Sequence, residues 1–163
     1  MTEEEREVRE FDFEMEWQGH LEFNIRWDFP DAPDLLMDEP PDMGGTGKGP
    51  NAARMIVAGV ANCMSASLAF CLTKSRVPME SMRIRCHGEL SRNERGRLRL
   101  VGIRIEPLVR MRERDMARLE RCLGIFEDFC IVTESIRNGV PVDVRVHRVD
   151  EDGNETFVPH GGG

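Results

Sequence analysis

Apolar and polar residues alternate through residues 11–29, which read FDFEMEWQGHLEFNIRWDF. The alternation is interrupted at Gly19 and resumes after it. Because a period of two places one kind of residue on one face of a strand, the pattern predicts a β-hairpin with one apolar face. Pro30 and Pro33 end the hairpin, and the Asp-, Pro- and Gly-rich segment 31–50 is interpreted as a long loop.

The pattern changes after Asn51, since residues 55–72 are apolar on almost every side. Asn51 is a suitable N-cap and Val77-Pro78 a suitable stop, so one long helix is predicted between them. At about 1.5 Å per residue it would be roughly 36 Å long, enough to cross a small domain. A helix without a polar face must be covered on every side, and we expect a second subunit to complete that cover.

A second alternating pattern follows this helix. In residues 82–90, apolar side chains alternate with charged and polar ones, which predicts a half-buried strand that turns at RNERG (92–96). Residues 98–105 return with the same period, and the phase slips by one residue at Gly102, where we expect a β-bulge. Cys86 falls on the apolar face and is interpreted as a core residue.

Two further elements complete the predicted order. Apolar residues recur at spacings of three and four from Met116 to Phe126, which predicts an amphipathic helix that ends near Phe129. After a turn at Asn138-Gly139, four alternating valines predict a last strand: Val140, Val142, Val144 and Val146. The order β-β-α-β-β-α-β indicates an α+β fold, in which a long central buried helix lies against antiparallel sheets.

Length and charge restrict the domain organisation and the partners. The 163 residues suffice for one domain with a substantial core, which we place at residues 11–149. Residues 1–10 are interpreted as a disordered acidic tail and residues 150–163 as a flexible tail. The 30 acidic and 22 basic residues give a net charge of −8, so we expect no nucleic acid and no anionic membrane as partner.

The five cysteines form an odd set without a CxxC pair: Cys63, Cys71, Cys86, Cys122 and Cys130. No secretory leader opens the chain, and together these features predict a cytoplasmic protein. No cluster of Cys and His residues has the spacing of a zinc site, so we expect neither a metal nor a cofactor.

The stretch GGTGKGPNAARMIVAGVANC, residues 44–63, admits three interpretations. A phosphate-binding loop would need four residues between its first glycine and Gly47-Lys48, but Gly44 is separated from that pair by only two. A membrane span is disfavoured because polar residues interrupt the apolar run and amphipathic strands flank it. The third interpretation is a loop that leads to a buried thiol, in which Cys63 is either an apolar filler or a reactive group.

Spacing restricts how the cysteines can pair. Cys63 and Cys71 are eight residues apart on one predicted helix, roughly 12 Å by rise, and Cys122 and Cys130 have the same spacing. A disulfide needs Cα atoms within about 7 Å, so neither pair can close while helical. Cys63 with Cys130 is the pairing between different elements that also involves a helix end, where the backbone dipole lowers a thiol pKa.

Several short motifs occur in a fixed order around these cysteines. They are DEPPDMGG, Gly44-Gly45, Gly49-Pro50-Asn51, the apolar run MIVAGVANC that ends at Cys63, and FCIVTESIRNGVPVDV with Cys130. With these motifs the chain resembles the OsmC/Ohr family over about residues 11–149. The resemblance implies an OsmC-like fold and an intertwined homodimer with two active sites at the subunit interface.

The resemblance also implies a cysteine-based thiol peroxidase. In that chemistry an organic hydroperoxide oxidises Cys63 to a sulfenic acid, Cys130 resolves it as a disulfide, and a small dithiol or lipoyl-type reductant restores the pair. The alternative is an OsmC-like dimer with a degraded peroxidase site that acts as a small-ligand binding or stress-related protein.

A departure from the family pattern motivates this alternative. Family peroxidases carry Pro and then Glu at the start of the cysteine helix, and this Glu pairs with an Arg of the first hairpin. The present chain has Ala52, Ala53 and Arg54 at the helix start. Where the family has its hairpin Arg, this chain offers His20 and Glu22.

A charge swap would make Arg54 the cation that supports the Cys63 thiolate and Glu22 its partner. Nine residues of ideal helix turn by about 900°, which puts Arg54 on the face opposite Cys63. A kink or the second subunit would have to bring it round. Otherwise Arg54 is a solvated residue of the first turn.

Overall fold

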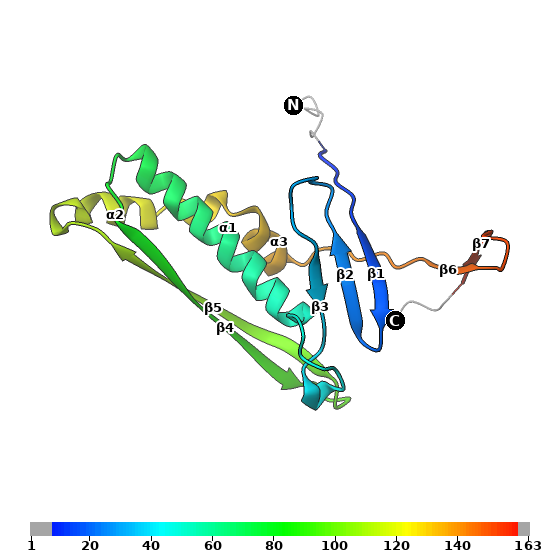
Figure 1. Ribbon diagram of the computed structural model, residues 1–163. Helices are drawn as coiled ribbons and strands as arrows, with labels where there is room; N and C mark the ends of the chain where they lie inside the picture. The colour runs from blue at the N-terminus through cyan, green and yellow to red at the C-terminus, as the bar shows by residue number, and fades with distance from the viewer. Residues whose placement is uncertain (1–7, 160–163) are drawn as a thin grey trace, which may run out of the picture.

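The computed structural model describes residues 8–159, which form three antiparallel sheets and three α-helices (Figure 1). The strands are β1 (Glu14–Gly19), β2 (Glu22–Arg26), β3 (Leu35–Met37), β4 (Ser81–Arg92), β5 (Leu98–Arg110), β6 (Val146–Val149) and β7 (Glu155–Val158). The helices are α1 (Ala52–Lys74), α2 (Met116–Leu123) and α3 (Ile131–Asn138), with 3-10 turns at Pro41–Met43, Glu113–Asp115 and Phe126–Phe129. The predicted tail at residues 1–10 lies mostly outside the described part of the chain.

The first predicted hairpin is confirmed. β1 and β2 pair with Met15 opposite Ile25 and Trp17 opposite Phe23, and the register shifts near Gly19 at the turn. β3 pairs with the other edge of β2. This third strand was not predicted, because three residues inside a Pro- and Gly-rich segment show too little alternation to be recognised.

Helix α1 begins where the sequence predicts, at the Asn51 cap. The Oδ1 atom of Asn51 accepts a hydrogen bond from the Arg54 backbone N–H at 3.2 Å, which satisfies one free donor of the first turn. The inner face of α1 packs on β4, β5, α2 and α3, and its buried residues are Val57, Val60, Ala61, Leu68 and Leu72. The outer face is open, since Ile56 is 45% and Phe70 59% exposed. One chain therefore covers only one side of its central helix.

Within residues 8–159, α1 is also the one helix with the length and composition of a membrane span, with a mean hydropathy of 1.9. The core helix of a soluble protein passes the same test. Here α1 contacts both strands of the long hairpin and both shorter helices, so it forms the centre of this chain's own packing.

The hairpin of β4 and β5 runs along α1 and contains the predicted bulge (Figure 1). Glu89 lies opposite Gly102 and Leu90 opposite Leu100, so Val101 has no partner in the ladder. An unpaired residue of this kind bends the strand and increases its twist.

The interpretation of Cys86 as a core residue is wrong, because its thiol is exposed. α1 packs closely on the hairpin at Gly88, where a Cβ would lie 3.0 Å from the Cγ2 atom of Val57. Cys86 shares the strand face with Gly88 by alternation, but the helix covers only part of that face. The uncovered part is a groove that Cys86 lines.

The predicted second helix is present but shorter than expected, and a third helix that was not predicted follows it. α2 ends at Leu123, where Gly124 follows, and a 3-10 turn at Phe126–Phe129 leads to Cys130. α3 starts directly after Cys130, which adopts an extended conformation as its N-cap. Its eight residues are too few for a helical repeat to stand out in the sequence.

The predicted last strand is also wrong. Val140, Val142 and Val144 lie outside any strand and are 59%, 83% and 59% exposed. Further along the chain, β6 and β7 pair as a small hairpin that Figure 1 shows apart from the other elements. The observed order is β-β-β-α-β-β-α-α-β-β, and β7 lies where we expected a flexible tail. A strand pattern needs an edge to pair with, and the described chain offers none to these valines.

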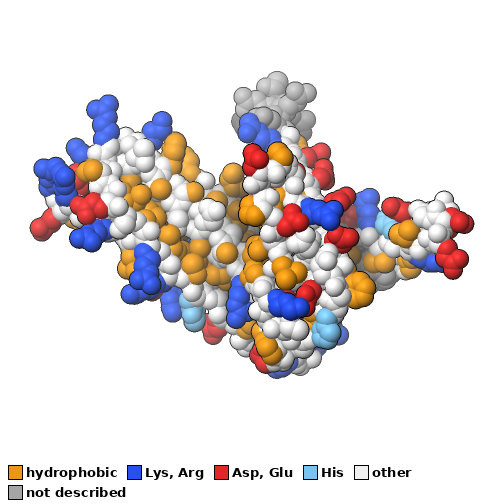
Figure 2. All heavy atoms as spheres, viewed as in Figure 1, with side chains coloured by type: hydrophobic (Ala, Val, Ile, Leu, Met, Phe, Trp, Pro, Cys, Tyr) orange, Lys and Arg blue, Asp and Glu red, His pale blue; other side chains and the backbone are white. Residues whose placement is uncertain are grey.

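The core of the chain lies where the C-terminal half of α1 meets α2. It consists of Leu68, Leu72, Val77, Cys122 and Phe126. Other large apolar side chains stay at the surface, and Figure 2 shows them both on the β1–β3 sheet and over the helical part of the chain. Trp17 is 64% and Phe29 69% exposed. Apolar surface of this extent usually marks an interface.

Candidate redox site

Two cysteines from distant parts of the sequence meet beside α1. Cys63 lies on α1, and Cys130 caps α3, which packs against α1. The two thiols lie close enough for each to shift the pKa of the other. Cys130 is only 1% exposed, whereas Cys63 is half-buried. Cys63 is therefore the sulfur that a small molecule reaches first.

The first turn of α3 gives polar partners to both sulfur atoms. The Thr133 hydroxyl lies 2.8 Å from Cys130 Sγ. The backbone N–H groups of this turn also lower the pKa values of both thiols: those of Val132 and Thr133 act on Cys130, and those of Ile131 and Val132 act on Cys63. A helix leaves these N–H groups without internal partners, so the N-terminal end of the α3 dipole is directed at the pair.

The pKa values of the two thiols are shifted in opposite directions. Burial raises the pKa of Cys63, and the hydrogen bond with Cys130 raises it further, while the N–H groups of α3 offset only part of this. Burial also raises the pKa of Cys130, but hydrogen bonds from Cys63, Thr133 and the α3 backbone outweigh it and lower the pKa. Of the two thiols, Cys130 therefore ionises more readily than Cys63.

The three residues considered as thiolate support lie elsewhere in the chain. Arg54 donates to the N-cap side chain at the start of α1, at 3.1 Å. Glu22 forms an ion pair with Lys48 at 2.7 Å. His20 is exposed at the β1–β2 turn, with a φ of 53°. Among the described residues, none of the three belongs to the groups that shift the pKa of Cys63, and Glu22 pairs with Lys48 instead of Arg54.

The glycine-rich loop before α1 is organised around Asp38. The buried Asp38 carboxylate accepts hydrogen bonds from the Thr46 hydroxyl at 2.7 Å and from the backbone N–H groups of Glu39, Thr46 and Lys48. The Thr46 hydroxyl lowers the pKa of Asp38 most, burial opposes it, and the N–H groups add to it, which brings the pKa to about 2. The loop thus cradles an anion, and that anion is a side chain of the same protein.

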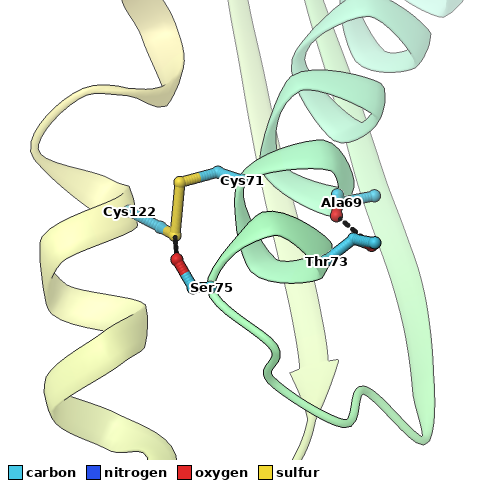
Figure 3. Close-up of a disulfide and its surroundings, with 5 residues drawn as sticks. All are labelled: Ala69, Cys71, Thr73, Ser75 and Cys122. Carbon is cyan, nitrogen blue, oxygen red and sulfur yellow. Dashed lines mark hydrogen bonds between the residues drawn. A yellow bond between two sulfur atoms is a disulfide. The ribbon is translucent and has the colours of Figure 1, made fainter.

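A second sulfur pair, Cys71 on α1 and Cys122 on α2, forms a disulfide that was not predicted from the sequence (Figure 3). The hydroxyl of Ser75 lies 3.5 Å from Cys122 Sγ. The signal was present in the spacing: Cys71 follows Cys63 by eight residues, and Cys122 precedes Cys130 by eight. Two antiparallel segments that bring one pair together therefore bring the other together as well.

A groove of about 510 Å³ lies between α1, β5 and α3, and neither Cys63 nor Cys130 is among its lining residues. Apolar side chains line most of it, among them Val60, Met64 and Ile103, while Thr133 and Arg137 contribute to its polar side. Thr133 therefore contacts Cys130 and also lines the groove. Another groove, of about 460 Å³, lies between the start of α1 and β4.

Residues 45–145 match the family model described as OsmC-like protein. This match spans more than half of the chain, and the chain belongs to the OsmC-like family. Comparison with curated protein sequences gives no significant match.

Several solved structures share the fold. An OsmC-like protein from Vibrio cholerae superposes with a TM-score of 0.67 at 16% identity, over 78% of this chain and 94% of that chain. An organic hydroperoxide resistance protein from Legionella pneumophila gives 0.61 at 15% identity, over 80% and 92%. That of Bacillus subtilis gives 0.54 at 18% identity, over 79% and 93%. At these identities the likeness establishes the mixed α/β fold with antiparallel sheets.

Proposed function

We propose that this protein is a thiol peroxidase that reduces organic hydroperoxides through Cys63 and Cys130. The observation that carries the proposal is the proximity of an accessible and a buried thiol from different elements, each of which shifts the pKa of the other. Two proteins of the same fold are described as organic hydroperoxide resistance proteins, which supports this substrate class.

The pair contains its own general base. An unperturbed thiol with a pKa near 8.5 is only about 3% ionised at pH 7, and the pKa of Cys63 is raised. The Cys130 thiolate accepts the proton of Cys63, and Cys63 Sγ attacks the terminal oxygen of the hydroperoxide. The O–O bond breaks, Cys63 becomes a sulfenic acid, and the alkoxide leaves as an alcohol with the proton from Cys130.

The second step consumes the sulfenic acid. The regenerated Cys130 thiolate attacks Cys63 Sγ, an S–S bond forms, and hydroxide leaves and is protonated to water. A small dithiol or lipoyl-type reductant then opens this disulfide in two exchange steps and becomes a cyclic disulfide. One hydroperoxide and one dithiol thus yield alcohol, water and oxidised reductant.

The proposal includes a homodimer. The open face of α1 carries a stripe of exposed residues at helical spacing: Ile56, Gly59, Asn62, Ala66 and Phe70. Small residues at the middle of this stripe permit close approach of a second helix. Together with the exposed apolar side chains of the β1–β3 sheet, the stripe supports a symmetric pairing of two copies.

The test is turnover of cumene hydroperoxide by the full chain with dihydrolipoamide as the reductant. The wild type should consume hydroperoxide catalytically, and Cys63→Ser should fall to background. Cys130→Ser should give at most one slow turnover and leave a sulfenic acid at Cys63, which dimedone traps. Cys86→Ser is the matched control and should keep wild-type turnover, since Cys86 is an exposed thiol on β4. Equal hydroperoxide consumption by the wild type and Cys63→Ser would reject the proposal.

The raised pKa of Cys63 favours a second candidate function. Among the described residues, no arginine or lysine belongs to the groups that shift this pKa, so Cys63 is a weak nucleophile unless Cys130 deprotonates it. The second candidate is a small-ligand binding protein of the same fold, with the mainly apolar groove between α1, β5 and α3 as its site. It predicts neither sulfenic acid nor a Cys63–Cys130 bridge in mass spectra of peroxide-treated protein.

A further inference from the structure

Thr133 has an unusual place in the chain, because its hydroxyl is directed at a buried sulfur. Its Oγ1 atom lies 2.8 Å from Cys130 Sγ, and Thr133 itself is 8% exposed. A buried thiolate that loses a donor cannot recruit water in its place, so the loss is costly. The Thr133 hydroxyl therefore favours a negative charge on Cys130 over one on Cys63.

The accessibility of the two sulfur atoms also favours Cys130 as the sulfur that leaves with the charge. Cys63 is half-buried, whereas Cys130 is only 1% exposed. An external thiolate must approach the sulfur that it attacks along the S–S bond. Of the two sulfur atoms, Cys63 is therefore the more accessible to an external thiolate, and attack on Cys63 expels Cys130.

We propose that Thr133 is a positioning residue that makes Cys130 the leaving group when the Cys63–Cys130 disulfide is reduced, so that the reductant attacks Cys63. The proposal rests on the proposed function in one respect only, namely that this disulfide forms during catalytic turnover. The disulfide itself can also be formed without a hydroperoxide.

The exchange balances as two successive displacements. The thiolate of a dithiol reductant attacks Cys63 Sγ, the S–S bond breaks, and its electron pair stays on Cys130 Sγ, which accepts the Thr133 O–H. The second thiol of the reductant loses its proton, attacks the reductant sulfur of the mixed disulfide, and releases Cys63, which takes up that proton. The protein gains two electrons, and the reductant becomes a cyclic disulfide.

Three charged side chains on α3 and on the turn before it pair with one another. They are Glu134 and Arg137 on α3 and Glu127 on the preceding turn. Arg137 forms ion pairs with Glu127 and with Glu134, both at 2.7 Å. Among the described residues, no charged side chain belongs to the groups that shift the pKa of Cys130. The Thr133 hydroxyl is therefore the side chain through which the leaving group can be changed with the least disturbance.

The experiment compares Thr133→Val, which keeps the shape and removes the hydroxyl, with Thr133→Ser, which keeps the hydroxyl. Both variants carry Cys86→Ser to remove the exposed thiol. The Cys63–Cys130 disulfide is formed with oxidised glutathione and reduced with dihydrolipoamide, and free Cys130 is quantified by alkylation and peptide mass spectrometry. Because the Thr133 hydroxyl stabilises the charge that develops on Cys130 in the transition state, the disulfide of Thr133→Val should be reduced about threefold to tenfold more slowly. The reduction rate of Thr133→Ser should stay within about twofold of that of the protein with Cys86→Ser alone.

Two further readouts separate this role from a merely structural one. The pH midpoint of Cys130 alkylation should move upward in Thr133→Val and remain in place in Thr133→Ser. In the wild type, the mixed disulfide trapped by acid quenching during reduction with glutathione should be on Cys63, a result that needs no variant to fold.

An adduct on Cys130, or equal reduction rates and alkylation midpoints in Thr133→Val and Thr133→Ser, would overturn the proposal. Because oxidised glutathione forms the disulfide, slower reduction in Thr133→Val supports this inference even for a protein without hydroperoxide turnover. Absent turnover together with this result would reject the proposed function alone.

Discussion

Cys71 and Cys122 are joined by a disulfide whose Cα atoms are 5.7 Å apart, and Cys63 and Cys130 meet across the same interface. Eight residues of α1 separate the two pairs, which corresponds to roughly 12 Å along the helix. That distance is too long for direct thiol–disulfide exchange between the two cysteine pairs. The disulfide lies within the core, beside Leu68 and Leu72, whereas Cys130 of the thiol pair contacts the Thr133 hydroxyl. We therefore assign a structural role to Cys71–Cys122.

Breaking the structural disulfide should destabilise the fold substantially. The cross-link joins residues 51 positions apart, and a loop of this length corresponds to about 4 kcal/mol in the chain-entropy model. Urea unfolding of Cys71→Ala/Cys122→Ala should show this loss relative to the oxidised wild type. Reduced wild type isolates the effect of the link from that of the altered core packing. If oxidised and reduced wild type unfold at the same urea concentration, the disulfide has no structural role.

Asp38 should make stability depend on pH in the acid range. The pKa of folded Asp38 is about 2, below its ordinary value of 3.8. Its contribution is therefore complete above the unfolded value and is lost as the pH falls through the folded value. The melting temperature of the wild type should fall more steeply between pH 4 and pH 2 than that of Asp38→Asn. At pH 7 the Asp38→Asn variant should be the less stable of the two. Parallel pH profiles of the two proteins would contradict this role.

Two glycines of the same loop should not tolerate a side chain. A Cβ at Gly45 would overlap the carbonyl oxygen of Glu39, and one at Gly49 would overlap that of Leu36. Because backbone atoms must move to make room, Gly45→Ala and Gly49→Ala should each cost about 1–3 kcal/mol in unfolding free energy. Gly124→Ala is the control, since its Cβ would meet only an ordinary contact at 3.5 Å. Equal losses in all three variants would show that steric fit is not the cause.

The sequence predicts those elements whose pattern is long and local. The first hairpin, the Asn51 cap of α1 and the β4–β5 hairpin with its bulge are confirmed. The failures concern short or unpaired segments. β3 has three residues and α3 has eight, so neither shows a full period. The valines from Val140 to Val144 alternate like a strand, but strand formation depends on an edge elsewhere in space, which a local pattern does not contain.

The candidate site was predictable in its residues and less so in its chemistry. The spacing and the family motifs single out Cys63 and Cys130, and the fold brings their thiols into contact. The role of Thr133 could not be predicted, because it depends on the break before α3 that places Cys130 at an N-cap. Cys86 was misinterpreted because alternation assigns a face to a residue and does not tell how far the covering helix extends.

The exposed stripe on α1 provides a test of the homodimer. Ala66 lies in the middle of this stripe and is exposed within the single chain. In a dimer packed through α1, Ala66→Glu would bury an unpaired carboxylate, so the dissociation constant should rise at least about 100-fold. Ala117→Glu makes the same change at an exposed position of α2 and should leave association unaffected.

Sedimentation equilibrium measures both variants against the wild type, whose expected mass is twice that of the 18.6 kDa chain. The unfolding free energy of each variant at low concentration shows whether Ala66→Glu acts on association or on the fold. A wild type with the mass of one chain, or an Ala66→Glu variant that associates as tightly as Ala117→Glu, would refute packing through this face. The apolar stripe would then need another occupant, because a helix with one uncovered apolar side does not remain exposed without cost.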